Sequence, residues 1–451
     1  MKLEGKRFLV VGAGKSGIAA MGLLKGQGYP VILYDGNGNL EEGELQKKSV
    51  WLQDAEIYLG SLPEEALKRC EIAVLSPGVP TDIPEVERMR RAGLAIWGEI
   101  ELGYAFEQGR VLAITGTNGK TTTTALLGEI MGRHFSHVHV VGNIGIPYTA
   151  MVKDTRPDSV TVAEISSFQL ETVHTFCPQV SAILNITPDH LNRHHTMENY
   201  QEAKKRIARN QGSGQVCVLN YEDGVLREFA SQVKASVLFF SSARKLEEGI
   251  YLEGGRIVWA AGGEASVVCS TRDLQLIGKH NYENVMAASA MALVYGVPAD
   301  IVRACVKSFK GVEHRIEYVA EKDGVAYYND SKGTNPDAAI KGIQAMNRPT
   351  VLIGGGYDKD SVYTEWIRSF DGKVRKLILL GETKEKIARD ARECGFADYV
   401  FAETFEEAVL EAARTAKPGE AVLLSPACAS WDMFSSYEVR GEKFKEIVNS
   451  L

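Results

Sequence analysis

The segment "ITGTNGKTT" (residues 114–122) lies between a predicted strand, "RVLAIT", and a predicted helix, "TTTTALLGEIMGRH". It resembles the phosphate-binding pattern G-x-x-x-x-G-K-[ST], but Ile114 stands where the first glycine should be, and Gly116 lies only three positions before Gly119. A shorter loop can still direct backbone N–H groups and the positive end of a helix at phosphate. We therefore expect Lys120 to reach the outer phosphates of a nucleotide and the Thr121 hydroxyl to bind magnesium. The alternative is a glycine turn whose lysine is only solvated.

Length and composition describe a soluble globular chain. Its 451 residues correspond to about three domains of ordinary size, and the net charge of −7 argues against nucleic acid or an anionic membrane as a partner. Seven scattered cysteines without a C-x-x-C pair favour reduced thiols, so we expect a cytoplasmic protein. No segment is long and apolar enough to predict a membrane span.

Strand and helix patterns alternate along the whole chain, which predicts an α/β protein with a parallel, doubly wound sheet in each of three units. We expect a Rossmann-like domain at 1–98, a central phosphate-loop domain at 99–311 and a second Rossmann-like domain at 312–451. The third unit is predicted to contain the strands "VAYYND", "TVLIGGG", "KLILLG", "YVFAE" and "AVLLSPA".

The N-terminus carries a second nucleotide signal. Residues 12–17 read G-x-G-x-x-G between a strand and a helix, and Asp35 ends the next strand. Taken alone, this pattern is typical of NAD or FAD binding, with the acid on a ribose. The alternative is a turn of the same shape that binds another nucleotide.

Three further residues are candidates for a metal or substrate site. Glu164 and His190 follow predicted strands near the phosphate loop, where the carboxyl ends of parallel strands meet. In "NYQEAKKRIAR", helical spacing places Lys204 on the apolar face, which predicts either a lysine that extends to solvent or one turned towards a site. We interpret His194 and His195 as loop residues rather than zinc ligands.

Taken together, these segments resemble the Mur ligase family, the ATP-dependent amino-acid ligases of peptidoglycan precursor synthesis. The matching segments follow the family's order: "TGTNGKTT", "GNIG", "EISSFQLE", "TPDHL", "AK", "GKHNYEN", "EHRIE" and "NDSKGTNP". Within the family, the N-terminal glycines and "SPACASWDMF" (425–434) resemble the members that add D-glutamate to UDP-N-acetylmuramoyl-L-alanine.

The resemblance implies roles for individual residues. It implies that ATP is bound by Gly116, Thr117, Asn118, Gly119, Lys120, Thr121, Thr122, Asn281, Arg315 and Asp330, across a domain cleft. It implies two magnesium sites, one at Thr121 and Glu164 and one at His190 and a carbamylated Lys204. It implies that the UDP-sugar is held by Gly14, Lys15, Ser16, Asp35, Gly36, Asn37, Ser76, Gly78 and Asn143, and D-glutamate by Lys332, Thr334, Lys359, Ser430 and Tyr437. The implied catalytic residues are Lys120, His190, Lys204 and Asn143, in a monomer whose partners are small molecules.

Three rival functions remain open at this point. A nicotinamide-dependent oxidoreductase would use the first domain but leave the phosphate loop unexplained. Folylpolyglutamate synthetase would share the central domain and the ligation chemistry without needing a uridine-nucleotide domain. A nucleotide-regulated binding module would not need Glu164, His190 and Lys204 beside the loop.

Overall fold

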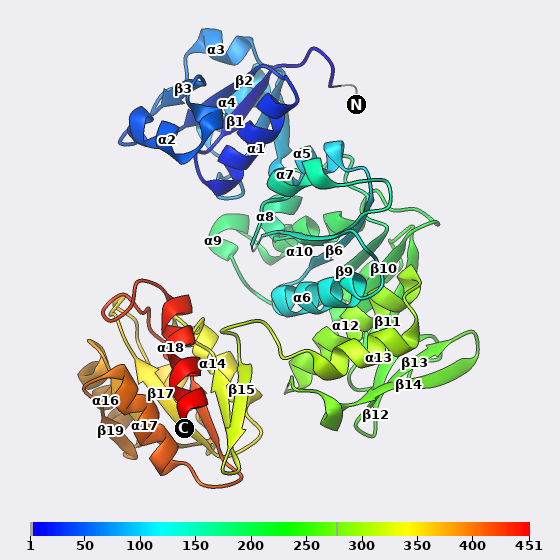
Figure 1. Cartoon of the computed structure of the whole chain (residues 1–451). Coiled ribbons are helices and arrows are strands. Elements are labelled where there is room, and N and C mark those ends of the chain that lie inside the picture. The colour runs from blue at the N-terminus through cyan, green and yellow to red at the C-terminus, as the bar shows by residue number, and fades with distance from the viewer. Residues whose placement is uncertain (1–2, 144, 277) are drawn as a thin grey trace. The chain divides into compact units, whose positions relative to one another are not determined.

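The computed structural model describes residues 3–143, 145–276 and 278–451. Ile144, in the quoted "GNIG" motif, lies outside the described residues. The chain forms two compact units, Met1–Val268 with Glu283–Cys305, and Cys269–Tyr282 with Val306–Leu451. Within the described residues the strands form three sheets, of five, nine and six strands (Figure 1). The predicted α/β class is therefore confirmed, whereas the boundaries 1–98, 99–311 and 312–451 remain predictions.

The first sheet is wholly parallel, with the order β3-β2-β1-β4-β5. Its strands are β1 (Phe8–Val11), β2 (Val31–Asp35), β3 (Glu56–Leu59), β4 (Ile72–Leu75) and β5 (Ala95–Gly98). Its helices are α1 (Lys15–Gly26), α2 (Glu42–Lys48), α3 (Glu64–Lys68) and α4 (Pro84–Arg91). Phe8 and Val10 pack with α1, while Leu9 and Val11 pack with α3 and α4. Both faces of the strand are buried because it lies between two layers of helices, which explains its unbroken apolar run.

The second sheet has the order β14-β13-β12-β11-β10-β9-β6-β8-β7. Its strands are β6 (Arg110–Thr115), β7 (Val138–Gly142), β8 (Val160–Glu164), β9 (Val180–Ile183), β10 (Val216–Asn220), β11 (Ser236–Ser241), β12 (Gly249–Glu253), β13 (Arg256–Ala261) and β14 (Glu264–Ser270). The helices along this part of the chain are α5 (Glu99–Phe106), α6 (Lys120–Gly132), α7 (Tyr148–Met151), α8 (Ser167–Leu170), α9 (Leu191–His194), α10 (Met197–Lys205), α11 (Gly224–Ala230), α12 (Lys279–Tyr295) and α13 (Ala299–Ser308). Strand β6, which leads into the phosphate loop, lies between β8 and β9, so the ends of both neighbours flank that loop.

The third sheet has the order β15-β16-β20-β17-β18-β19. Its strands are β15 (Glu317–Lys322), β16 (Val325–Asn329), β17 (Thr350–Gly355), β18 (Val374–Leu380), β19 (Tyr399–Phe401) and β20 (Ala421–Leu424). Its helices are α14 (Pro336–Ala345), α15 (Thr364–Arg368), α16 (Lys384–Glu393), α17 (Phe405–Thr415) and α18 (Tyr437–Ser450). One face packs against α14, α15 and α16, and the other against α17 and α18 (Figure 1).

The expectation of purely parallel sheets is wrong at two edges. Strand β13 pairs antiparallel with β12, and β15 pairs antiparallel with β16. Both pairs are joined by a two-residue turn that contains glycine, Gly254–Gly255 and Asp323–Gly324, each with positive φ. Such turns favour a hairpin over a helical crossover. Among the candidate site residues, Glu164 ends the parallel strand β8 and Asp35 ends the parallel strand β2.

Candidate active site

The phosphate loop connects β6 to α6 through two glycines with positive φ, Gly116 (φ 153°) and Gly119 (φ 86°). A side chain at Gly119 would lie 2.1 Å from Asn284 Oδ1, so this position requires glycine for space as well as conformation. The backbone N–H groups of Thr117 and Asn118 donate to the carbonyl and side-chain oxygens of Asn185, at 2.9 and 2.8 Å. The shortened loop is thus held against the segment that follows β9.

Two ammonium groups converge on one carbonyl of this loop. Lys120 Nζ donates to Gly116 O at 2.9 Å and to Thr117 O at 3.0 Å. Lys204 Nζ donates to the same Gly116 O at 2.8 Å, and it also lies over the Tyr200 ring, 4.7 Å from the centroid. Of the two alternatives that the helical spacing left open for Lys204, the structure supports the second, because Lys204 is buried and turned towards the loop.

Burial and the nearby charge of Lys120 lower the pKa of Lys204 from 10.5 to about 7. The nearby Asp189 carboxylate raises it, but to a smaller extent. A substantial fraction of Lys204 is therefore a neutral amine at neutral pH, and a neutral amine can act as a nucleophile. The same crowding of positive charge favours an anion at the loop.

Glu164 ends β8 beside the phosphate loop, in register with Ile114 of β6. Its buried carboxylate accepts a hydrogen bond from Asn143 Nδ2 at 3.1 Å, and its carbonyl accepts from the Asn143 N–H at 2.8 Å. Thr121 and Thr122 lie in the first turn of α6. The structure thus brings Glu164 and Asn143 into contact and places the two threonines at the end of the loop helix.

His190 lies in the segment after β9, and its φ of 52° is left-handed. Its side chain is half-exposed, with Nε2 3.5 Å from Asp189 Oδ2, and its ring lies 4.9 Å from that of Phe168. The interpretation of His194 as a loop residue is wrong: it ends α9, is buried, and pairs through Nε2 with Ser167 Oγ at 2.9 Å. His195 directly follows that helix and faces Asp82 at 2.8 Å.

The carboxyl ends of β1, β2 and β4 gather the predicted uridine-nucleotide residues. Asp35 accepts from the Ala13 N–H at 2.7 Å and from the Asn37 N–H at 2.9 Å, while Ser76 Oγ donates to Gly12 O at 3.3 Å. The other predicted residues here, on or beside these turns, are Gly14, Lys15, Ser16, Gly36 and Gly78. This is the point where the strand order reverses, which is the usual position of a ligand in an open α/β sheet. Lys15 Nζ also donates to Gly145 O at 2.5 Å.

In the second unit, Asp330 is buried between Ser425, which donates to its Oδ2 at 2.7 Å, and the Ile316 N–H, which donates to its Oδ1 at 3.3 Å. Burial raises its pKa from 3.8 to about 7 despite these donors and the nearby arginines. Arg315 stands between two residues with left-handed backbone, His314 and Ile316, and its buried Nε has no hydrogen-bond partner among the described residues. Asn281, at the start of α12, is also buried.

The predicted D-glutamate residues form two groups in this unit. Lys332 lies over the Tyr437 ring, 5.3 Å from its centroid, and the Thr334 N–H donates to the Lys332 carbonyl at 2.8 Å. Lys359 Nζ lies over the Trp431 ring, 4.6 Å from its centroid, and Trp431 directly follows Ser430 in the chain. The buried Ser430 hydroxyl has no hydrogen-bond partner in the described part of the chain. The structure brings members of each group together.

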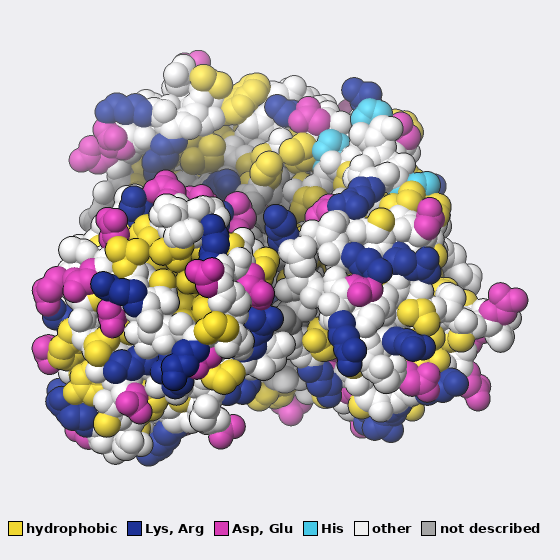
Figure 2. Space-filling view, turned by 60° about the horizontal axis from the view of Figure 1, so that its bottom comes forward, with side chains coloured by type: hydrophobic (Ala, Val, Ile, Leu, Met, Phe, Trp, Pro, Cys, Tyr) yellow, Lys and Arg dark blue, Asp and Glu magenta, His cyan; other side chains and the backbone are white. Residues whose placement is uncertain are grey.

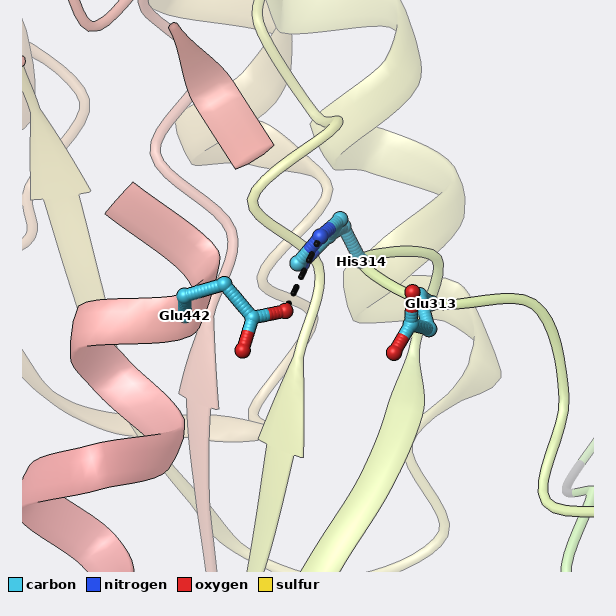
Figure 3. Close-up of side chains that lie close together, drawn as sticks. All are labelled: Glu313, His314 and Glu442. Atoms are coloured by element: carbon cyan, nitrogen blue, oxygen red, sulfur yellow. Dashed lines mark ion pairs between the residues drawn. The ribbon is translucent and has the colours of Figure 1, made fainter. Parts of the chain in front are cut away.

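Glu313, His314 and Glu442 offer ligand atoms within 4.8 Å of one another, as a metal site would (Figure 3). His314 Nε2 lies 3.6 Å from Glu442 Oε1. However, the Lys445 ammonium already pairs with both acids, at 3.1 Å from Glu313 and 2.7 Å from Glu442. Because a fixed cation occupies this position, we assign no metal to it.

Charge is mixed over the molecular face drawn in Figure 2, where basic and acidic side chains are interspersed. Among the described residues, no helix combines the length and the apolar character needed to cross a membrane. Among the described residues, no disulfide joins any two of the seven cysteines.

Sequence reasoning missed several residues that shape the site. Asn185 bonds the loop backbone, and the Tyr200 hydroxyl lies 2.9 Å from Thr117 Oγ1. Asn284 lies beside Gly119, and Phe168 lies against His190. A signal existed for Tyr200, since it shares the apolar helix face with Lys204, whereas the contacts of the other three depend on pairing between distant segments.

A strand-loop-helix with a loop lysine, a strand-end carboxylate and a buried second lysine is the arrangement of an enzyme that binds a nucleoside triphosphate. Sequence comparison identifies the family to which the chain belongs within this class. Models of the MurD-like N-terminal domain, the Mur ligase middle domain and the Mur ligase glutamate ligase domain match residues 6–98, 114–292 and 314–428.

Curated relatives match over the full length. UDP-N-acetylmuramoylalanine--D-glutamate ligase of Lachnoclostridium phytofermentans is 55% identical, covering 100% of this chain and 99% of that protein. The protein of the same name from Lachnospira eligens is 53% identical, with 100% of each chain covered. This chain therefore belongs to the Mur ligase family, whose members catalyse ATP-dependent amide-bond formation in peptidoglycan precursor synthesis.

Solved structures agree at the level of the fold. MurC of Thermotoga maritima, a UDP-N-acetylmuramate-alanine ligase, is 19% identical with a TM-score of 0.58 and covers 99% of both chains. MurF of Acinetobacter baumannii is 20% identical with a TM-score of 0.59, covering 85% of this chain and 87% of that one.

Proposed function

We propose that this protein joins D-glutamate to UDP-N-acetylmuramoyl-L-alanine in the cytoplasm, acting as a monomer and releasing ADP and phosphate. The full-length relatives that carry this activity in their names support the choice of substrates. The observation that carries the chemistry is Lys120, whose ammonium group lies 2.9 Å from the Gly116 carbonyl of the glycine loop that leads into α6. The Lys120 ammonium and the positive end of α6 together favour a phosphate at the loop.

The proposed ATP site consists of the loop and the first turn of α6. Its residues are Gly116, Thr117, Asn118, Gly119, Lys120, Thr121 and Thr122. For Asn281, Arg315 and Asp330 we propose further nucleotide contacts. The unpartnered Nε of Arg315 supports this role, because a buried donor without an acceptor is unfavourable until an acceptor arrives.

We propose magnesium at Thr121 and Glu164, and a second ion at His190 and a carbamylated Lys204. Oxygen donors suit this ion, and a carbamate would convert Lys204 into such a donor. The pKa of about 7 supports the modification, since the neutral Lys204 nitrogen can attack the carbon of CO2. An N–C bond forms, one C=O π bond opens to give the carbamate oxygen anion, and the nitrogen loses a proton to solvent. When bound, magnesium reduces the repulsion between phosphate and the incoming carboxylate.

The proposed reaction has two steps. The alanyl carboxylate attacks the γ-phosphorus of ATP, the bond to ADP breaks, and an acyl phosphate forms. The D-glutamate amine then attacks the acyl carbon, the carbon–oxygen bond to phosphate breaks, and the amine loses a proton as the amide forms. Lys120 would hold the transferring phosphoryl group and offset its negative charge in both steps.

The remaining assignments concern the other substrates. The uridine nucleotide would lie at the ends of β1, β2 and β4, against Gly14, Lys15, Ser16, Asp35, Gly36, Asn37, Ser76 and Gly78, and Asn143 would face the muramoyl part. Lys332, Thr334, Lys359, Ser430 and Tyr437 would hold D-glutamate. Two lysines suit its two carboxylates, and the unpartnered Ser430 hydroxyl would gain an acceptor.

Phosphate release in the presence of ATP, magnesium and UDP-N-acetylmuramoyl-L-alanine tests the proposal. Release should require D-glutamate, and L-glutamate, L-alanine and L-lysine should not replace it. Equal release with any of these amino acids would refute the assigned specificity. Borohydride should trap the acyl phosphate as an alcohol, and its absence under saturating ATP would refute the two-step route.

The adjacent lysines of α10 provide a matched test of the carbamate. Lys204→Ala should reduce turnover by about 10²-fold or more, whereas Lys205→Ala should not, because Lys205 pairs with Glu202 at 2.8 Å on another face of the helix. Protein prepared with 13C-bicarbonate should show a carbamate carbon signal that Lys204→Ala lacks and Lys205→Ala retains. A signal that persists in Lys204→Ala would contradict the assignment.

A further inference from the structure

Phe168 forms an aromatic surface under the segment that carries His190. The His190 ring lies 4.9 Å from it and the His194 ring 5.4 Å, nearly parallel at 21°. The Arg193 guanidinium carbon lies 4.8 Å from the same ring centroid. Since Phe168 lies four residues after Glu164, one short helix, α8, carries the contact surface for His190 close to a second proposed magnesium ligand.

Glu171, directly after α8, joins this segment to the loop that follows β4. Its carboxylate accepts from Arg193 Nη2 at 2.9 Å and from Thr81 Oγ1 at 3.2 Å, and its Oε1 lies 3.3 Å from His194 Nδ1. Arg193 Nη2 also donates to the Val79 carbonyl at 3.0 Å. Val79 directly follows Gly78, and Thr81 lies two residues further along the same loop. We assign Ser76 and Gly78 of this loop to the uridine nucleotide.

The pair between Arg193 and Glu171 differs from an ordinary surface ion pair. The two side chains are 13% and 14% exposed, so solvent screens them weakly, and each also bonds a second segment. The pair therefore fixes geometry, because a planar guanidinium holds its acceptors in one plane with little freedom.

The backbone conformation of His190 requires contacts that hold it in place. Both His190 (φ 52°) and His195 (φ 66°), which bracket α9, have left-handed backbone that residues other than glycine seldom adopt. A conformation of this kind persists only where surrounding contacts enforce it. The contacts around His190 include those of Phe168, Arg193 and His194, and His195 pairs with Asp82 at 2.8 Å.

We propose that Arg193 is a positioning residue that couples the loop after β4 to His190, so that binding of the uridine-nucleotide substrate strengthens metal binding at His190. This inference rests on the proposed function, which assigns those two segments to substrate and metal. Glu171 acts through Arg193 in the same coupling, and neither residue touches the reacting atoms. By thermodynamic reciprocity, metal at His190 strengthens substrate binding by the same factor.

The test measures Mn²⁺ affinity by electron paramagnetic resonance, with a non-hydrolysable ATP analogue present, before and after adding UDP-N-acetylmuramoyl-L-alanine. The wild-type protein should bind Mn²⁺ more tightly with the substrate. Arg193→Met should weaken Mn²⁺ binding about tenfold and abolish the effect of the substrate, and Glu171→Gln should do the same to a smaller extent. In turnover, kcat should fall while the KM for D-glutamate stays constant.

Arg88→Met is the matched control, because Arg88 forms an ion pair of the same length, 2.9 Å to Glu64, on the surface of the same unit. It should leave Mn²⁺ affinity and its dependence on substrate unchanged. Arg193→Lys keeps the positive charge but loses the planar guanidinium group, and it serves as the test if Arg193→Met does not fold. It should show weakened coupling between substrate and Mn²⁺ binding, with an unchanged circular dichroism spectrum. Unchanged Mn²⁺ affinity and coupling in a folded Arg193 variant would overturn the inference while wild-type turnover upholds the proposed function. Absence of wild-type turnover would instead overturn the proposed function.

Discussion

Lys204 in the first unit and Asp330 in the second carry opposite charges in water, yet the pKa of each lies at about 7 in the folded protein. For Lys204 the pKa falls from 10.5, because burial removes hydration and Lys120 repels the charged form. For Asp330 it rises from 3.8, because burial outweighs two hydrogen-bond donors and the attraction of arginines. Desolvation is the largest cause in both cases and acts against charge of either sign.

The hydrogen-bond partners of the two groups differ. Asp330 is enclosed by Ser425 and the Ile316 N–H, so its surroundings are largely satisfied by the protein itself. Lys204 has one carbonyl acceptor, shared with Lys120. Phosphate at the loop would therefore raise the pKa of Lys204. The pKa of Asp330 in the protein without ligand is set by contacts within its own unit.

The largest expected effect is on stability as a function of pH. Between about pH 3.8 and 7 the unfolded Asp330 carboxyl has lost its proton while the folded one keeps it, so this group lowers stability as pH rises. Between about 7 and 10.5 the folded Lys204 has lost its proton while the unfolded one keeps it, so this group raises stability as pH rises. Each contributes on the order of 4 kcal/mol across its window.

Urea unfolding over this pH range, in buffer free of bicarbonate, measures both slopes. Asp330→Asn should remove the lower-pH contribution alone, and Lys204→Met the higher-pH contribution alone. For each variant, the free energy of unfolding should lose its wild-type dependence on pH in the range named for that group. If a variant keeps the wild-type dependence there, the assigned pKa shift of that group is wrong.

The next largest effect tests what Lys120 does to Lys204. Lys120→Ala should lower the rate of ATP-dependent phosphate release about 10²–10³-fold. It should also raise the pKa of Lys204, because the repelling charge is gone. An NMR titration with 13C-labelled lysine measures that pKa. Lys153→Ala, at an exposed lysine of the same unit, should change neither quantity, and wild-type turnover in Lys120→Ala would disprove the phosphate-loop assignment.

A smaller effect is expected at Ser425, whose hydrogen bond holds the pKa of Asp330 down. Ser425→Ala should raise that pKa further and reduce the free energy of unfolding by about 1–3 kcal/mol above pH 7. Ser369→Ala is the control, since the Ser369 hydroxyl bonds the Trp366 carbonyl elsewhere in the same unit. An unchanged Asp330 pKa in Ser425→Ala would mean that the hydrogen bond has no part in setting it.

The smallest effect should follow Tyr200→Phe. The substitution removes the hydroxyl contact to Thr117 at 2.9 Å but leaves a ring beneath Lys204, so unfolding should become easier by about 1 kcal/mol. The pKa of Lys204 should hardly move, since the ring still excludes water. A shift of a full unit or more would show that the hydroxyl, rather than burial, controls Lys204.

Much of this architecture could be predicted locally. The strand before the phosphate loop was predicted at 110–115 and lies at Arg110–Thr115, and the helix predicted at 121–134 spans Lys120–Gly132. Apolar runs and glycine turns report the structure of their own segment, so they suffice for such elements. The same locality explains the errors. The antiparallel edges depended on two-residue turns that were not recognised, and His194 is buried by Phe168 and Ser167, which lie more than twenty residues away in sequence.

The amino-acid sequence by itself determined that the chain has a glycine loop between a strand and a helix, that Lys204 lies on the apolar face of its helix and that the family is that of the Mur ligases. These conclusions follow from residues close together in the chain or from motifs in a fixed order. Only the tertiary structure decided that Lys204 shares a carbonyl with Lys120, that Asp330 is buried enough to hold its proton, and that Arg193 joins the His190 segment to the loop after β4. Those properties depend on burial and on distances between remote segments, and spacing along a chain encodes neither.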